Sequence, residues 1–236
     1  MNGFVGAQHE FHDAAFVQGW ADRFVPTPPR IALFDLILEH VSASGLPSAH
    51  VVELGLGPGY MARHLLERNP TISYEGLDFS EVFFDVARKT IGSYMPRTKL
   101  TKADLMDQAW PRSLSQQPGA IISTWALHDL GGQEAVANVY ARCYEVLPKG
   151  GILINGDFIK PDGTSWTYEP GRFAAGLGQL DEGEPFAIVV DPVRVDRHLD
   201  LLRLAGFENP RSLALFEHNL DSPTAAQNYA CLMATR

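Results

Sequence analysis

Residues 51–60 read VVELGLGPGY, and the interpretation of the whole chain starts from this stretch. An apolar run ends in the carboxylate of Glu53, and three glycines with single-residue spacers follow: Gly55, Gly57 and Gly59. The dinucleotide fingerprint G-x-G-x-x-G would need its third glycine at Tyr60, so this loop departs from that fingerprint by one position. Glycines this close together let the backbone turn tightly and approach a ligand. We therefore expect a buried strand, a ligand-binding loop and then a helix.

Length and composition favour one globular α/β domain. The chain has 236 residues, of which 45% are hydrophobic and 20% are charged, and this is typical of a folded domain with a sizeable core. A formal charge of −9 gives no basic surface for a phosphate backbone, so nucleic acid is not an expected partner. No apolar run reaches the roughly 20 residues of a membrane span, and the first residues lack the pattern of a secretory signal. Cys143 and Cys231 lack C-x-x-C spacing, and we expect buried thiols in a cytoplasmic protein.

Strand and helix patterns alternate five times along the chain. Such alternation predicts a doubly wound, mostly parallel α/β sheet, and two further strand-like runs predict seven strands with an antiparallel strand at the C-terminal edge. The expected strands are 49–54, 73–78, 98–105, 120–127, 151–159, 212–218 and 228–235. The expected helices are 27–41, 60–68, one capped by Ser80, 136–147, and one from Asp191-Pro192 to about Leu204.

Two segments lie outside this alternation. Residues 1–45 are predicted to form an N-terminal helical lid segment ahead of a main domain at 46–236, and Phe16, Trp20 and Phe24 recur at helical spacing in it. The apolar face that these three side chains form either packs in the hydrophobic core or covers the bound ligand. Residues 159–190 are too long for a simple connection and follow a strand on its carboxyl side, where inserts commonly form substrate walls. We expect the acceptor to be bound by side chains from these two segments: Trp20, Arg23, Trp166, Tyr168 and Arg172.

Acidic residues close three of the expected parallel strands. Glu53 ends the first, Asp78 ends the second about 25 residues later, and Asp104 follows the third. In a doubly wound sheet the ligand binds outside these carboxyl ends, and an acid at the second strand is placed to bind a ribose diol. A phosphate would not favour the carboxylate of Glu53 beside it. The three acids therefore indicate an adenosine that carries an amine-bearing tail and no phosphate.

Five motifs in order carry a family resemblance: ELGLGPG, GLDFS, ADLMD, IISTWALHDL and VLPKGGILINGDF. Over residues 49–158 they resemble the class I S-adenosylmethionine (SAM)-dependent methyltransferases. The resemblance implies a Rossmann-like methyltransferase fold with SAM as co-substrate. It places the glycine loop along the methionine tail, Asp78 on the ribose and Phe79 against the adenine. The positions that would contact SAM are Glu53, Gly55, Gly57, Gly59, Asp78, Phe79, Asp104, Leu105, Thr124 and Trp125.

The stretch ALHDL follows the fourth strand, where methyl group and acceptor should meet. It resembles the L-H-D-W segment of small-molecule O-methyltransferases, with Leu130 in place of the tryptophan. In that family the matching histidine is the general base for a phenol, so His128 and Asp129 are the candidate catalytic residues. An imidazole with a pKa near 6.5 suits that role. A structural role or a role in positioning the substrate is the alternative for His128.

The predicted function is transfer of the SAM methyl group to a small molecule, at a hydroxyl oxygen, by direct in-line displacement. Methylation of nitrogen or carbon, and a SAM-binding module without catalysis, are the alternatives. Catechol-type enzymes bind magnesium through an acid at the fourth strand end, whereas Ser123 and Thr124 stand there, so no metal is expected. The partners predicted are a small-molecule substrate, with no nucleic acid and no membrane. The sequence leaves a monomer and a homodimer open.

Overall fold

The computed structural model describes residues 10–43, 45–130, 132–159, 193–216 and 229–236. One seven-stranded sheet runs through these residues in the order β3-β2-β1-β4-β5-β7-β6. Its strands are β1 (His50–Leu54), β2 (Ser73–Asp78), β3 (Thr98–Lys102), β4 (Ala120–Thr124), β5 (Ile152–Phe158), β6 (Glu208–Phe216) and β7 (Tyr229–Thr235). The first five are parallel, and β7 runs antiparallel between β5 and the edge strand β6. The predicted fold class is confirmed.

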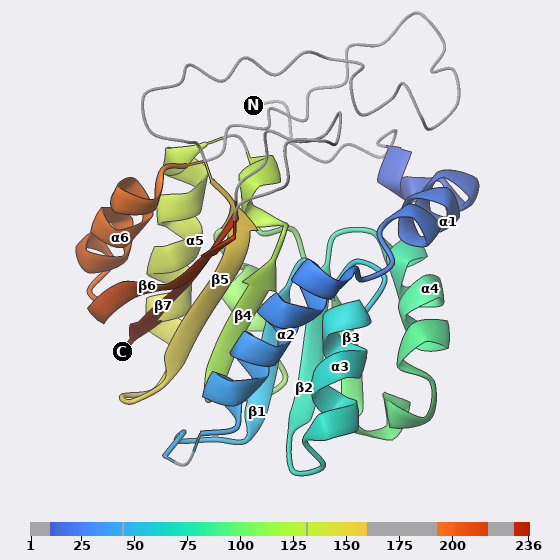
Figure 1. Ribbon diagram of the computed structural model, residues 1–236, viewed down its shortest axis with the longest axis horizontal. Helices are drawn as coiled ribbons and strands as arrows, with labels where there is room; N and C mark the ends of the chain where they lie inside the picture. Colours follow the sequence, from blue (N-terminus) through green and yellow to red (C-terminus); the bar gives the residue numbers. More distant parts are fainter. Residues whose placement is uncertain (1–9, 44, 131, 160–192, 217–228) are drawn as a thin grey trace, which may run out of the picture.

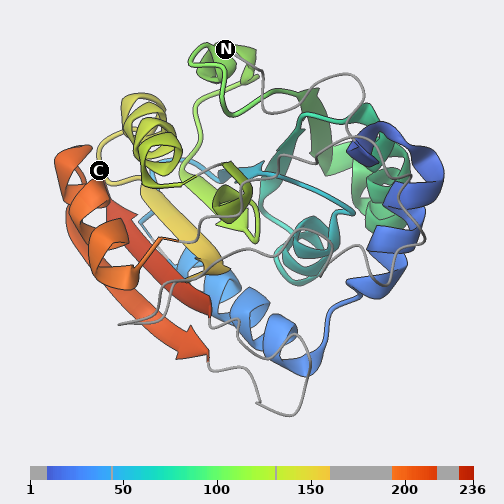
Figure 2. The same cartoon turned by 90° about the horizontal axis from the view of Figure 1, so that it is seen from above.

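Two helical layers cover the sheet, as Figures 1 and 2 show. The α-helices are α1 (Ala14–Arg23), α2 (Pro28–Val41), α3 (Tyr60–Arg68), α4 (Glu81–Ile91), α5 (Gln133–Val146) and α6 (Val195–Leu204). The short 3₁₀ helices are η1 (Glu10–His12), η2 (Gly92–Arg97), η3 (Trp110–Ser113) and η4 (Leu127–Leu130). Buried side chains of α2, α3 and α4 share one core with the sheet, while those of α5 and α6 share a second core on the opposite face.

The boundaries differ from the predicted ones where a polar turn ends a strand. β4 ends at Thr124, and the predicted continuation to 127 is replaced by a turn into η4. α6 begins at Val195 with Arg194 at its N-cap, while the predicted cap at Asp191-Pro192 lies outside the described residues. Thr27 is the N-cap of α2, but its side chain makes no capping hydrogen bond. Cys143 and Cys231 are buried free thiols.

Helix α2 is part of the core. Leu33, Phe34 and Ile37 are buried on the sheet, which follows from apolar residues recurring at helical spacing. A Cβ at Gly156 of β5 would lie 2.7 Å from Leu33 Cδ2, so a larger residue there would displace the Leu33 side chain. This packing fixes the start of α2 beside the carboxyl ends of β4 and β5. The predicted lid segment thus contains a helix that the domain core needs.

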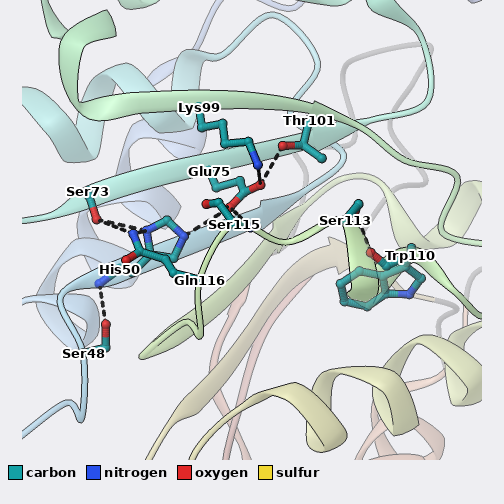
Figure 3. Close-up of polar contacts among 10 residues, drawn as sticks. All are labelled: Ser48, His50, Ser73, Glu75, Lys99, Thr101, Trp110, Ser113, Ser115 and Gln116. Carbon is teal, nitrogen blue, oxygen red and sulfur yellow. Dashed lines mark hydrogen bonds and ion pairs between the residues drawn. The ribbon is translucent and has the colours of Figure 1, made fainter.

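A buried carboxylate stabilises the β1–β2–β3 part of the sheet (Figure 3). Glu75 is fully buried; its Oε1 accepts from Thr101 Oγ1 at 2.6 Å and lies 3.1 Å from Lys99 Nζ. Its Oε2 accepts from the backbone N–H of Ser115 at 2.9 Å and lies 3.4 Å from His50 Nε2. Burial alone would raise the pKa of Glu75, but hydrogen bonds from His50, Ser115 and Thr101 hold it well below its usual range. The ionised carboxylate therefore joins three strands to the loop after η3.

Replacing this carboxylate should destabilise the fold without touching the ligand site. We expect Glu75→Gln to lower the free energy of unfolding by about 3–5 kcal/mol. The groups that pair with the buried carboxylate would lose its negative charge. Urea unfolding at pH 7 measures this. Glu81→Gln, which breaks the exposed pair of Glu81 with Lys102, should cost less than about 1 kcal/mol. A loss as small for Glu75→Gln as for Glu81→Gln would contradict the structural role.

Candidate functional site

A cavity of about 220 Å³ lies at the carboxyl ends of the strands. It brings together most of the predicted site residues: Trp20, Glu53, Gly55, Gly57, Asp78, Phe79, Asp104, Leu105, Thr124, Trp125, His128 and Asp129. Gly59 and Arg23 do not line it. Trp166, Tyr168 and Arg172 lie outside the described residues. Residues that the sequence interpretation did not select also line the cavity, among them Phe11, Arg30 and Phe158.

The glycine loop is tied to the end of β2 by one carboxylate. Asp78 Oδ2 accepts from the backbone N–H of Gly57 at 2.9 Å, and Oδ1 accepts from that of Ser80 at 3.1 Å. Gly57 has a φ of 52°, a conformation that glycine adopts without strain. Burial raises the pKa of Asp78 to about 6, although these backbone hydrogen bonds oppose the shift. A carboxylate accepts about four hydrogen bonds, so Asp78 keeps acceptor capacity for a ligand diol.

Gly59 has a packing role in this geometry. It is the N-cap of α3 with a φ of 79°. A Cβ there would lie 3.2 Å from Ala87 Cβ and from Ile91 side-chain carbons. The third glycine of the loop therefore lets α3 pack closely on α4, and the two earlier glycines are the ones at the cavity.

Glu53 is a buried acid at the cavity floor. Its Oε2 accepts from the Tyr74 hydroxyl at 2.7 Å, and the Thr124 side chain also hydrogen-bonds to it. Burial raises the pKa of Glu53 to about 8, with the negative charge of Asp78 as a smaller cause. The acid is therefore mostly protonated at neutral pH. A cationic group placed beside it would favour the charged form and lower that pKa.

Aromatic side chains of the N-terminal segment cover the loop side of the cavity. The Phe11 ring lies 6.1 Å from Phe79 and 5.8 Å from Trp20, centroid to centroid. Trp20 lies over the loop, 3.9 Å from where a Cβ on Gly57 would be. The Ser80 hydroxyl donates to the carbonyl of Phe11. A second, more open hollow of about 620 Å³ shares Phe79 and Asp104 with the cavity, so these two predicted adenine contacts stand between the two spaces.

The chain is strained where β4 opens into the cavity. Trp125 has a φ of 49°, which is rare for a bulky residue and costs on the order of 1–3 kcal/mol. Its backbone N–H donates to the Gly156 carbonyl at 2.9 Å, and its ring lies 5.5 Å from that of Tyr229. The guanidinium of Arg30 stacks on the same ring at 4.6 Å. Surrounding contacts therefore hold Trp125 in a conformation that places its ring at the cavity.

His128 lies between two carboxylates at the start of η4. Its Nδ1 lies 2.7 Å from Asp157 Oδ1, and its backbone N–H donates to Asp157 Oδ2 at 3.0 Å. Its Nε2 lies 3.2 Å from Asp129 Oδ1. Burial alone would lower the pKa of His128, but Asp129 and Asp157 raise it to about 9. Burial raises the pKa of Asp129. In the ligand-free protein His128 is therefore an imidazolium at neutral pH.

Asp157 and Arg30 are two charged residues at the site that the sequence interpretation missed. Asp157 is the one acid inside the apolar run GILINGDFI, and a buried acid in a core strand needs a partner. Arg30 is a cation in the first turn of α2, where the helix dipole disfavours positive charge. Both were visible as departures from the local pattern.

The pKa of His128 can be tested directly. Its imidazole should titrate near pH 9 by NMR, and Asp157→Asn should lower that value by about 1–3 pH units because an opposite charge in contact is lost. Stability that comes from the raised pKa is present below about pH 6.5 and is lost as pH rises through about 9. Asp200→Asn, on the exposed face of α6, is the control and should leave the titration unchanged. A parent His128 that titrates at or below 6.5 would contradict the ion-paired geometry.

The described residues contain neither a membrane-spanning helix nor a metal-binding cluster. None of their helices has the length and apolarity needed to cross a membrane. No group of three or more His, Cys, Asp or Glu side chains in the described ranges is arranged to hold a metal ion.

Comparisons with known proteins agree with this geometry. Residues 51–151 match the model of the methyltransferase domain family. Trans-aconitate 2-methyltransferase of Acidovorax sp. (strain JS42) is 34% identical over 104 residues, which cover 44% of this chain and 36% of that protein. The chain thus spans 36–37% of the length of the curated relatives it matches.

Solved structures share the fold at low sequence identity. An O-methyltransferase family protein from Burkholderia thailandensis superimposes with a TM-score of 0.64 at 19% identity, covering 96% of this chain and 61% of that chain. Human N-acetylserotonin methyltransferase in complex with SAM gives a TM-score of 0.61 at 16% identity, covering 98% and 60%. The chain therefore shares the fold of these methyltransferase structures. The match to the methyltransferase domain family covers residues 51–151, less than half of the chain, and the chain is similar to that family over this part.

Proposed function

We propose that this protein transfers the methyl group of SAM to a small-molecule acceptor, with a hydroxyl oxygen as the nucleophile. The observation that carries the proposal is the single cavity in which acids from three strand ends, the glycine loop and the His128–Asp129 pair all meet. Ligands of doubly wound sheets bind in this place. The curated relatives and the SAM-bound neighbour support the class of reaction.

The residues of β1, β2 and the loop after β3 suit the co-substrate. Glu53 is placed for the amino group, since its raised pKa returns toward normal when a cation pairs with it. Asp78 suits the ribose diol, and its hydrogen bond to Gly57 keeps the loop next to the sugar. Asp104 and Phe79 suit the adenine. When bound, SAM supplies a methyl group that its sulfonium charge activates.

The residues after β4 suit the acceptor. Thr124 and Trp125, which the resemblance places against SAM, line the same cavity as the His128–Asp129 pair. An imidazolium cannot accept a proton, so we assign His128 the role of a positioning residue in this state. Its charge, held by Asp157, keeps the Asp129 carboxylate ionised and oriented. The hydroxyl proton then passes to Asp129, whose raised pKa makes it a stronger base than an ordinary aspartate.

The acceptor itself is proposed only as a small organic molecule. One relative is named for trans-aconitate and one structural neighbour for N-acetylserotonin, and such different acceptors give no single expectation for this chain. Trp20 lines the cavity and stays a proposed acceptor contact. Trp166, Tyr168 and Arg172 stay proposed contacts outside the described residues. Nitrogen or carbon acceptors would use the same cavity without needing Asp129 as a base.

Calorimetry tests the co-substrate. SAM and S-adenosylhomocysteine should bind, and NAD should not, because the cavity floor carries Glu53 where a pyrophosphate would have to lie. Asp78→Ala should weaken S-adenosylhomocysteine binding by about 1.5–3 kcal/mol, the scale of lost hydrogen bonds to a charged group. Asp85→Ala, on the exposed face of α4, is the control and should change nothing. NAD binding, or an Asp78→Ala protein with parental affinity, would refute the assignment.

Kinetics test the roles of His128 and Asp129. With a hydroxyl acceptor, Asp129→Asn should lower kcat by about 10²–10⁴-fold, the usual value of general-base assistance. His128→Asn should lower kcat less and leave the affinity for S-adenosylhomocysteine unchanged. If His128 were the base instead, the parental rate would rise with pH through about 9, and this inflection would vanish in His128→Asn.

A further inference from the structure

Arg30 is a cation at the acceptor side of the cavity. Its guanidinium lies over two aromatic rings, 4.9 Å from the centroid of Phe24 and 4.6 Å from that of Trp125. Nη1 donates one hydrogen bond, to the Phe24 carbonyl at 3.2 Å. Contacts with two rings restrict the orientation of the planar group, because guanidinium stacks on aromatic faces. Arg30 is therefore presented as a fixed, oriented cation.

The charge of Arg30 has no carboxylate partner in the described part of the chain. No Asp or Glu of the described ranges comes within ion-pair distance of it. Burial lowers the pKa of Arg30 and Tyr229 opposes this shift, but arginine stays protonated in proteins. A half-buried guanidinium has five N–H donors, and desolvating them without partners costs free energy. An anionic ligand in the cavity would supply those partners.

The position of Arg30 distinguishes the two ends of the cavity. The acids placed for SAM are on β1, β2 and the loop after β3. Arg30 instead contacts Trp125 after β4, and Trp125 packs on Tyr229 of β7. In the sheet order, β4, β5 and β7 lie on the opposite side of β1 from β2 and β3. The free cation of the described cavity is thus on the side where His128 and Asp129 lie.

We propose that Arg30 binds a carboxylate of the methyl acceptor, so that the substrate class is a small hydroxy acid. This inference rests on the proposed function and adds the acceptor's charge to it. The planar fork of a guanidinium matches a carboxylate with two parallel hydrogen bonds. Arg30 and Asp129 line the same cavity, so one small molecule can present its carboxylate to Arg30 and its hydroxyl to Asp129. The cavity would then bind one zwitterionic co-substrate by its ammonium and one acid by its carboxylate.

A pair of isosteric probes tests the inference without knowledge of the natural acceptor. The protein, saturated with S-adenosylhomocysteine, is titrated with 4-hydroxybenzoate and with 4-hydroxybenzamide by ligand-observed NMR. The acid should bind about 10–150-fold more tightly than the amide, which is the range expected for hydrogen bonds to a charged group. In Arg30→Gln this preference should disappear while the affinity for S-adenosylhomocysteine stays at the parental value. Arg88→Gln on the exposed face of α4 is the control and should keep the preference.

The outcomes are distinct. A parent protein that binds the acid no more tightly than the amide overturns the inference, and this comparison needs no variant to fold. An Arg30→Gln protein that loses affinity for S-adenosylhomocysteine instead would show that Arg30 binds the carboxylate of the co-substrate, which also overturns it. Arg30→Lys keeps the charge but not the fork, so it should retain part of the preference. A parent protein that binds no S-adenosylhomocysteine at all would refute the proposed function itself.

Discussion

The hydrogen bond from the Gly57 N–H to the Asp78 carboxylate is the contact on which the site depends. It joins the loop after β1 to the end of β2, so the two strands present one continuous surface to a ligand. The bond requires a backbone at positive φ, and it requires an acid in a place where burial raises its pKa. Neither condition helps the fold by itself. The turn at Gly57 costs conformational entropy, and burying Asp78 costs desolvation free energy. The hydrogen bond between them offsets part of both costs. Such local conflicts are expected where function constrains the sequence.

Charge is distributed across the cavity according to the same logic. Three acids lie toward β1, β2 and β3. Toward β4, β5 and β7 the imidazolium of His128 is paired with Asp129 and Asp157, and Arg30 is a cation without a carboxylate partner among the described residues. An overall charge of −9 gives no hint of this separation. In a partly desolvated space each of these groups has a stronger field than it would have in water. The field of these groups then orients a zwitterion and an acid as they approach, before either contacts the cavity.

How far the sequence could predict this site depends on how local the signal is. The sheet follows from alternating patterns and the strand-end acids follow from spacing, so Glu53, Asp78 and the fold class were accessible. Gly59 does not line the cavity described above; it lets α3 approach Ala87 of α4, a contact between segments that spacing cannot describe. The charge state of His128 was inaccessible for the same reason. An ordinary pKa of 6.5 suggested a base, whereas Asp157, 29 positions away, makes it a cation.

The acceptor side of the cavity is built on rigid parts of the fold. Leu33 packs into the space left by Gly156, and this fixes the helix turn that carries Arg30. Trp125 holds the guanidinium from the other side, at the cost of a strained backbone. Strain of this kind persists only when neighbours over-determine it, and here the Gly156 carbonyl and the ring of Tyr229 do so. A site whose supports are locked by packing keeps its geometry to a fraction of an ångström, which is what alignment of an acceptor for methyl transfer requires. The strained Trp125 and the tightly packed Gly156 therefore both help to orient Arg30, the cation that we assign to the acceptor.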